Sequence, residues 1–275
     1  MHRRKFTAAV LGGYKMQITQ IMEALFAWSP INRENKSDIP VYGDMNRDVS
    51  RIAVCMIATP DVLRKASELG AEFLITHEPT FHDSIMRYKD EEAFLSDSVY
   101  LEKKRLIEEL DIPIYRFHDY SHFTDVDKIH TGFVNKLGLK GEFDGERVLT
   151  LSEPMWISEI EKTLAERLDL KHIRFIGQRS KRVKRIALCA GAWGEKTLYE
   201  QLNRQDIDLV ICGEICEWSI CEYVRDSAQL GIDKALFVLG HMSSERSGME
   251  YICKYINETM EGVTARYIEC GEVYN

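Results

Sequence analysis

The feature that most constrains the fold of this chain is a regular alternation between short apolar runs and amphipathic stretches, which begins at residue 51. The runs are rich in β-branched residues, as expected of buried strands, and the stretches between them carry apolar residues at helical spacing. Predicted strands include residues 51–58, 72–76, 112–117, 184–190, 208–213 and 234–240, and predicted helices include residues 60–70, 98–110, 157–170 and 244–260. This alternation predicts an α/β protein with mixed, largely parallel sheets.

The same rhythm occurs in both halves of the chain, so we expect two similar α/β lobes. Before the alternation begins, residues 17–28 are expected to form an amphipathic helix and residues 29–50 a polar loop. The predicted organisation is a disordered or mis-assigned start at residues 1–16, a first lobe at residues 17–140 that residues 235–275 complete, and a second lobe at residues 141–234.

Composition argues against several classes of protein. The 275-residue chain has a formal net charge of -8, which does not favour binding to nucleic acid. No apolar run approaches the roughly 20 residues that cross a bilayer, and the N-terminal stretch has no convincing cleavage site. The seven cysteines are odd in number and lie mostly within apolar runs, as buried free thiols do. We therefore expect a cytoplasmic protein without membrane contact.

Polar side chains collect where the predicted strands end. The stretches "ITHEPTFH", "RFHDYSH" and "LGHMSSE" each join an apolar run to histidines and carboxylates, and "ICGE" adds a further carboxylate. Ligands of open α/β sheets bind beyond the carboxyl ends of the strands, so these side chains are expected to meet in one cleft. The residues are His77, Glu78, His82, His118, Asp119, His122, Glu214, His241 and Glu245.

The spacing within these clusters also matters. A helix that begins just after His241 would place His241 and Glu245 on one face, one turn apart. His118 and His122 have the same spacing, but "HDYSH" has no strong helical pattern. Any single cluster is more simply interpreted as a hydrogen-bonded structural histidine or a solvated helix face. Their joint occurrence after three predicted strands favours a metal site.

The donor types restrict the metal. A mixture of imidazoles and carboxylates suits Zn, Fe(II), Mn or Co better than Ca or Mg. The candidates outnumber the ligands of one tetrahedral ion. Two divalent metal ions bridged by a carboxylate would account for this number of donors, and such pairs activate water for hydrolysis.

These motifs, in the order "ITHEP", "HDYSH", "CGE" and "GHMSSERSGMEYI", resemble the Nif-three-like (Ngg-interacting-factor-three-like) family, whose members are also called GTP cyclohydrolase I type 2 homologues. The resemblance covers about residues 17–275, and its most specific motif is GH-x3-E followed by "RSG". It implies two α/β lobes with a dinuclear metal site in the cleft between them. It also implies a homo-oligomer, a hexameric ring with its sites facing an internal cavity.

The resemblance implies which positions of this chain hold metal ligands, and two of these positions have a different residue type from the family. His77 matches the first of the family's paired histidines, and Glu78 stands where the second would be. His118 matches the histidine of the family's H-x3-D segment, and His122 takes the place of its aspartate. The exchange keeps the numbers of imidazoles and carboxylates constant, so we expect a two-metal site with redistributed ligands.

The remaining positions match the family. His241 and Glu245 are the last ligand pair, and Glu214 is a cleft carboxylate that could handle protons, as could Glu78. Trp193, in "AGAWGEK", lies in a turn that forms part of the cleft in the family. It could stack on a substrate ring, or it could simply pack at a tight turn.

Three functions remain open from the sequence. The first is a metal-dependent hydrolase that acts on a phosphoester or nucleotide-like small molecule. The second is a non-catalytic protein that stores, delivers or senses metal. The third is a structural adaptor whose metal cluster only stabilises the fold. Metal-dependent turnover would distinguish the first from the other two.

Overall fold

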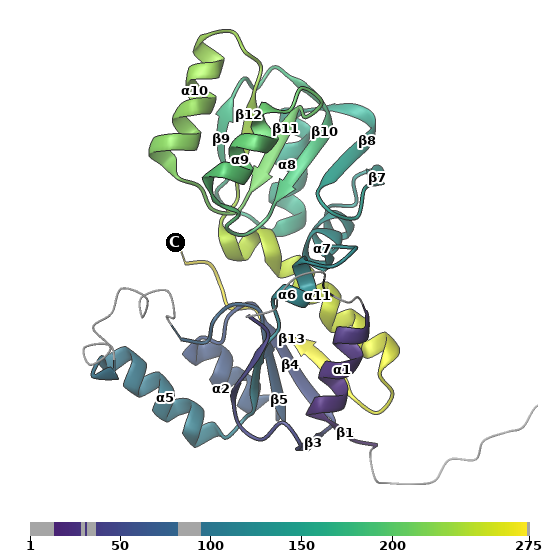
Figure 1. The fold of residues 1–275 in the computed structure, drawn as a ribbon, viewed down its shortest axis with the longest axis vertical. Helices are drawn as coiled ribbons and strands as arrows, with labels where there is room; N and C mark the ends of the chain where they lie inside the picture. Colours follow the sequence, from purple (N-terminus) through teal and green to yellow (C-terminus); the bar gives the residue numbers. More distant parts are fainter. Residues whose placement is uncertain (1–13, 29–30, 32–36, 82–94, 274–275) are drawn as a thin grey trace, which may run out of the picture.

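The computed structural model describes residues 14–28, 31, 37–81 and 95–273. Figure 1 shows two α/β lobes, with helix α11 (His241–Thr259) passing from one to the other. Helices α6 (Asp119–His122) and α7 (Lys128–Leu137) lie beside it where the lobes meet. The expected α/β class with two mixed sheets is therefore confirmed.

The first lobe contains a five-stranded sheet with the order β13-β4-β5-β6-β2. Its first four strands are parallel, and β2 pairs antiparallel with β6 at the edge. One face packs against α1 and α11, and the other against α2 and α5. The bounds are α1 (Ile18–Trp28), β2 (Ile39–Tyr42), β4 (Arg51–Cys55), α2 (Pro60–Glu68), β5 (Phe73–Thr76), α5 (Ser98–Leu110), β6 (Ile114–Arg116) and β13 (Thr264–Tyr267), with β1 (Met16–Gln17) and β3 (Asp48–Val49) forming a separate pair.

The second lobe contains a six-stranded sheet with the order β7-β8-β10-β11-β12-β9. Strands β10, β11 and β12 are parallel, whereas β7, β8 and β9 run antiparallel to their neighbours. Helices α7 and α8 cover one face, and α9 and α10 cover the other. The bounds are β7 (Gly141–Phe143), β8 (Val148–Trp156), α8 (Ile157–Leu168), β9 (Arg174–Gly177), β10 (Arg182–Cys189), α9 (Gly194–Asn203), β11 (Leu209–Cys212), a π-helix (Glu217–Cys221), α10 (Glu222–Gln229) and β12 (Ala235–Val238).

Local signals explain where several helices begin. The hydroxyl of Thr59 accepts a hydrogen bond from the Val62 N–H, and Pro60 follows it at the first position of α2. The Asp97 carboxylate caps α5 through the Tyr100 N–H. In the described part of the chain, no helix has the length and apolar character that a membrane crossing requires.

A close approach of backbones holds α7 against α11. A Cβ atom on Gly132 would lie 2.4 Å from the Ser247 carbonyl oxygen, and one on Gly248 would lie 2.5 Å from Cα of Ile129. Neither position has room for a side chain, because real Cβ atoms do not approach other atoms so closely. The "RSG" glycine is therefore a packing residue that sets the distance between the two helices.

One expectation for local structure was wrong, and one segment that the sequence left open is helical. Residues 29–50 were expected to be a loop, but they include edge strand β2, where Pro40 is tolerated because an edge strand has unpaired N–H positions. "HDYSH", which has no strong helical pattern in the sequence, forms the short helix α6, because the Asp38 carboxylate accepts the N–H groups of His118, Asp119 and Tyr120. Both depend on partners that are distant in the sequence.

Other boundaries differ slightly from the sequence pattern. Helix α11 begins at His241, three residues before the expected start at 244. Strand β7 was not expected. The predicted division assigned residues 235–275 to the first lobe. Strand β12, at the start of this range, instead pairs with β11 and β9 in the sheet of the second lobe.

Candidate metal centre

Strand ends from both lobes meet at one place. His77 and Glu78 follow β5, and His118 lies between β6 and α6. From the second lobe, Glu214 follows β11 and His241 follows β12. The side chains come into contact across the lobes, as the general geometry of α/β sheets predicts.

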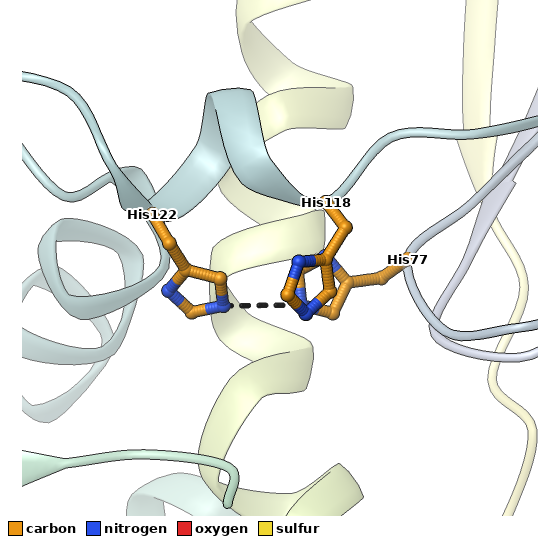
Figure 2. Close-up of side chains that lie close together, drawn as sticks. All are labelled: His77, His118 and His122. Atoms are coloured by element: carbon orange, nitrogen blue, oxygen red, sulfur yellow. Dashed lines mark hydrogen bonds between the residues drawn. The ribbon is translucent and has the colours of Figure 1, made fainter. Parts of the chain in front are cut away.

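Three imidazoles form the first group of candidate ligands, shown in Figure 2. One ligand atom from each of His77, His118 and His122 lies within 4.8 Å of the others. The Nε2 atoms of His77 and His122 are 3.2 Å apart, and the rings of His77 and His118 stack with centroids 4.5 Å apart. Imidazole nitrogens this close together suit a shared cation, which would replace the hydrogen bond between His77 and His122.

Acceptors behind the rings fix the orientation of the first two imidazoles. Nδ1 of His77 lies 3.2 Å from the Phe117 carbonyl oxygen, and Nδ1 of His118 lies 2.9 Å from Asp119 Oδ1. Carbonyl and carboxylate oxygens only accept hydrogen bonds, so each Nδ1 must carry the proton. The lone pair is thereby left on Nε2, the arrangement typical of histidines that bind metals.

The third imidazole, that of His122, is also oriented by an acceptor at its Nδ1. Nδ1 of His122 lies 3.1 Å from Asp127 Oδ2, and both side chains are buried. Asp127 also accepts the backbone N–H of His130 at 2.7 Å, which caps α7. One carboxylate therefore anchors a helix and orients His122.

The second group mixes imidazole with carboxylate and shares His77 with the first. Its other members are Glu78 and Glu245. Glu245 Oε2 lies 3.5 Å from Nε2 of His77 and 3.1 Å from Nε2 of His241. Glu245 Oε1 lies 3.5 Å from Nε2 of His122. The Glu245 carboxylate thus lies between the two groups.

His241 extends the second group toward solvent. Its Nε2 lies 2.8 Å from Glu78 Oε1, and its Nδ1 lies 2.7 Å from Glu214 Oε1. The side chain of Glu214 is 58% exposed, whereas that of Glu245 is 3% exposed. The cluster therefore runs from a buried carboxylate to one at the surface.

The pKa values of the cluster shift in both directions, according to whether a carboxylate or another imidazole is the nearest charge. Burial opposes the charged form of His241, but hydrogen bonds with surrounding carboxylates outweigh it and raise its pKa to about 12. The neighbouring Asp127 likewise overcomes burial and raises the pKa of His122 to about 10. Burial would raise the pKa of Glu78, but the hydrogen bond with His241 lowers it to about 2. Burial and the nearby His77 lower the pKa of His118 to about 4.

The space around Glu245 fits a bound cation. Among the described residues, Glu245 Oε2 has no well-aligned hydrogen-bond partner, although it is fully buried. A Cβ on Gly191 would lie 2.0 Å from Glu245 Oε1, so only glycine leaves room for this carboxylate. A buried, underbonded carboxylate oxygen facing imidazole nitrogens is a donor set that a divalent metal satisfies.

A cavity of about 550 Å³ opens over the cluster. Its charged and imidazole walls include most of the candidate ligands, together with Arg116. Its apolar wall consists of Phe123, Ala190, Ala192 and Trp193. Trp193, predicted from the sequence to contact substrate, lines this cavity with the Arg147 guanidinium 3.9 Å from its ring centroid.

The structure brings together most of the residues that the sequence singled out, which are His77, Glu78, His118, Asp119, His122, Glu214, His241 and Glu245. His82 lies outside the described residues. Sequence reasoning missed Asp38, Asp127, His130 and Arg116. The pattern "DKIH" could have marked Asp127 as a helix cap, but nothing in the sequence pairs it with His122.

The fold and the cluster define a two-lobed α/β protein whose interlobe cleft is lined with candidate metal ligands. A profile of the Duf34/NIF3 (NGG1p interacting factor 3) family matches residues 16–271, and the chain belongs to this family. The expected Nif-three-like resemblance is therefore confirmed.

Individual relatives agree with this assignment. The chain is 22% identical over 263 residues to a "GTP cyclohydrolase 1 type 2 homolog" of Clostridium perfringens, covering 90% of this chain and 93% of that protein. Among solved structures, it is similar to protein ybgI of unknown function, with a TM-score of 0.72, 20% identity and 94% and 99% of the two chains covered. It is also similar to reduced HcgD from Methanocaldococcus jannaschii, with a TM-score of 0.68, 15% identity and 93% and 99% covered. At these identities the structural likeness concerns the fold.

Proposed function

We propose that the interlobe cluster binds two divalent metal ions, from among Zn, Fe, Mn and Co, and that the protein is a metal-dependent hydrolase. The proposed substrate is a phosphoester or nucleotide-like small molecule. The observation that carries the proposal is the presence of two ligand groups that share His77 beneath one cavity. When bound by these residues, such ions would lower the pKa of a water molecule and so supply the nucleophile for hydrolysis.

The candidate ligands would be divided between the two ions. His118 and His122 would hold one ion together with His77, and Glu78, Glu245 and His241 would hold the other. Asp119 and Asp127 accept Nδ1–H bonds and so keep two of the Nε2 lone pairs directed into the cluster.

Glu78 and Glu214 are the proposed groups for proton transfer. Glu214 bonds Nδ1 of His241 and is half exposed, so it can exchange a proton with solvent through Oε1. Glu78 reaches the same ring at Nε2 and lines the cavity. Because Nε2 of His241 would hold the ion, the two carboxylates would handle protons separately, Glu78 at the cavity and Glu214 at the surface.

The test is elemental analysis of protein purified without a histidine tag. We expect about two metal equivalents per chain, and their loss in a His77→Ala, His241→Ala double variant. His172→Ala, which changes an exposed histidine outside the cluster, is the matched control. Folded wild-type protein that takes up no Zn, Mn or Fe(II) after reconstitution would refute the proposal. Metal-loaded protein is then screened with phosphoesters and nucleotides.

One observation favours a second function, which is metal storage, delivery or sensing. The exposure of Glu214 leaves the His241 end of the cluster accessible to solvent, and this suits ion exchange as well as substrate entry. Rapid exchange of bound metal without turnover of any phosphoester would support this alternative. Turnover that depends on bound metal would support the hydrolase.

We also propose, on the basis of the family resemblance, that six copies assemble into a ring. Size-exclusion chromatography with light scattering tests this directly. A mass close to six times that of one chain supports the ring, and a monomer or dimer at micromolar concentration contradicts it.

A further inference from the structure

We propose that Arg116 is the anion anchor of the cavity, and that the ligand it selects is an organic phosphate whose apolar group lies against Phe123 and Trp193. The proposal deepens the proposed function and rests on it, because it names the substrate class of the same site. Arg116 is the last residue of β6, directly before the segment that carries His118 and His122.

The position of Arg116 is fixed by the backbone beside the cluster. Its Nε donates a hydrogen bond to the His77 carbonyl oxygen at 3.1 Å, and its side chain is 16% exposed. Its Nη2 lies 3.7 Å from Glu78 Oε2, which is beyond hydrogen-bond distance. The hydrogen bond through Nε anchors the guanidinium, and among the described residues the ion pair of its Nη2 with Glu78 is too long to be a hydrogen bond.

The charge of Arg116 distinguishes it within the cavity. Of the described residues that line the cavity, it is the one lysine or arginine. Glu78 balances part of this charge, but Glu78 Oε1 is already engaged by His241. The planar fork of a guanidinium matches two oxygens of a phosphate, and arginine remains charged at any pH relevant to the protein.

The opposite wall selects the rest of the ligand. The Phe123 and Trp193 rings pack edge to face, with centroids 6.0 Å apart, and Arg147 holds Trp193 from outside the cavity lining. Together with Ala190 and Ala192, they form a preorganised apolar surface. A cavity of about 550 Å³ is large enough for a small organic group beside a phosphate.

Calorimetric titration tests the proposal with two probes, inorganic phosphate and phenyl phosphate. The full-length protein is used in Zn-loaded form and after EDTA treatment. We expect Arg116→Gln to weaken binding of both probes by about tenfold or more, because a charge-assisted bidentate contact is lost. Arg116→Lys should weaken binding less, since it keeps the charge but not the fork. Arg47→Gln, which removes an arginine–aspartate pair outside the cavity, should bind as wild type does.

The outcomes separate this inference from the hydrolase proposal. Metal content and turnover test the hydrolase, whereas the Arg116 variants test anion binding in both the metal-loaded and the metal-free protein. Folded Arg116→Gln protein that binds both probes as wild type does would overturn the proposal. If Arg116→Gln does not fold, wild-type affinity in Arg116→Lys overturns it instead.

Two further titrations test the ligand class. Phenyl phosphate is expected to bind more tightly than phosphate, because its ring leaves water for the apolar wall. Equal affinity for the two would contradict the role of Phe123 and Trp193. Phenylacetate is expected to bind more weakly than phenyl phosphate, and equal binding would overturn the assignment of a phosphate.

Discussion

Nδ1 of His122 lies 3.1 Å from Oδ2 of Asp127, and this buried contact joins the candidate metal centre to the start of helix α7. The aspartate has two separate tasks. Its Oδ1 caps the helix through the N–H of His130, and its Oδ2 sets the tautomer and direction of the His122 ring. A substitution at Asp127 can therefore change the metal affinity while the cap of the helix is kept.

Asp127→Asn is expected to weaken metal binding by about 10- to 100-fold, as losses behind metal-binding histidines typically do. The cap should survive, because asparagine is as good an N-cap as aspartate. Competition with a chromophoric chelator measures the affinity. Asp97→Asn makes the same change at the N-cap of α5, away from the cluster, and should leave metal affinity unchanged. Equal affinity in Asp127→Asn and wild type would contradict the assigned role.

Asp38→Ala should destabilise the protein and loosen the metal site together. The carboxylate accepts the N–H groups that begin α6, and their loss costs about 1–3 kcal/mol for each buried group left unpaired. Urea unfolding measures the free energy, and chelator competition measures the affinity. Asp38→Asn keeps one acceptor oxygen and is expected to fall between wild type and Asp38→Ala. A loss of stability without any loss of metal affinity would show that the metal site does not depend on this contact.

Gly248→Ala tests the close approach of α7 and α11. The added methyl group would lie 2.5 Å from Cα of Ile129, so the helices must separate, at a cost of about 1–3 kcal/mol. Because α11 carries His241 and Glu245, metal affinity should fall as well. Gly138→Ala places a methyl group where nothing lies within 4 Å, so it strains only its own turn and should spare the metal site. Equal metal affinity in Gly248→Ala and Gly138→Ala would contradict this role for the helix contact.

Glu72 gives a pH dependence that is remote from the metal centre. Burial would raise its pKa, but hydrogen bonds from Ser50, Lys15 and Arg51 outweigh it and lower the pKa from 4.5 to about 2. Because the folded-state pKa is depressed, Glu72 stabilises the fold above pH 4.5 and loses this effect as the pH falls toward 2. Glu72→Gln should therefore be less stable than wild type by about 1–3 kcal/mol at pH 7.

The gap between Glu72→Gln and wild type should stay constant from pH 7 to pH 5 and narrow between pH 4 and pH 3. Urea titrations at these four pH values measure it. Glu68→Gln, which removes an exposed pair with Lys65, should show a small effect with little pH dependence. A gap that widens as the pH falls would refute the assignment.

Much of the fold could be predicted because its signals are local. Apolar periodicity located β4, β5, β10, β11 and β12, and helical spacing predicted a helix over residues 60–70, where α2 runs from Pro60 to Glu68. Strand β2 could not be predicted in the same way, because it is short, contains Pro40 and is held by pairing with β6. Its partner strand lies far along the chain, beyond the reach of a local pattern.

The candidate site, like the fold, was predictable from local sequence only in part. The sequence by itself determined which imidazoles and carboxylates follow strand ends, and a parallel sheet then requires His77 and His118 to emerge on one edge. The tertiary structure decided how they are aimed. Asp38 reaches His118 across 80 residues, Glu78 reaches His241 across 163, and Gly248 sets the distance to α7. Periodicity records only which face of an element is buried, whereas hydrogen bonds and backbone contacts between distant segments depend on how whole elements pack.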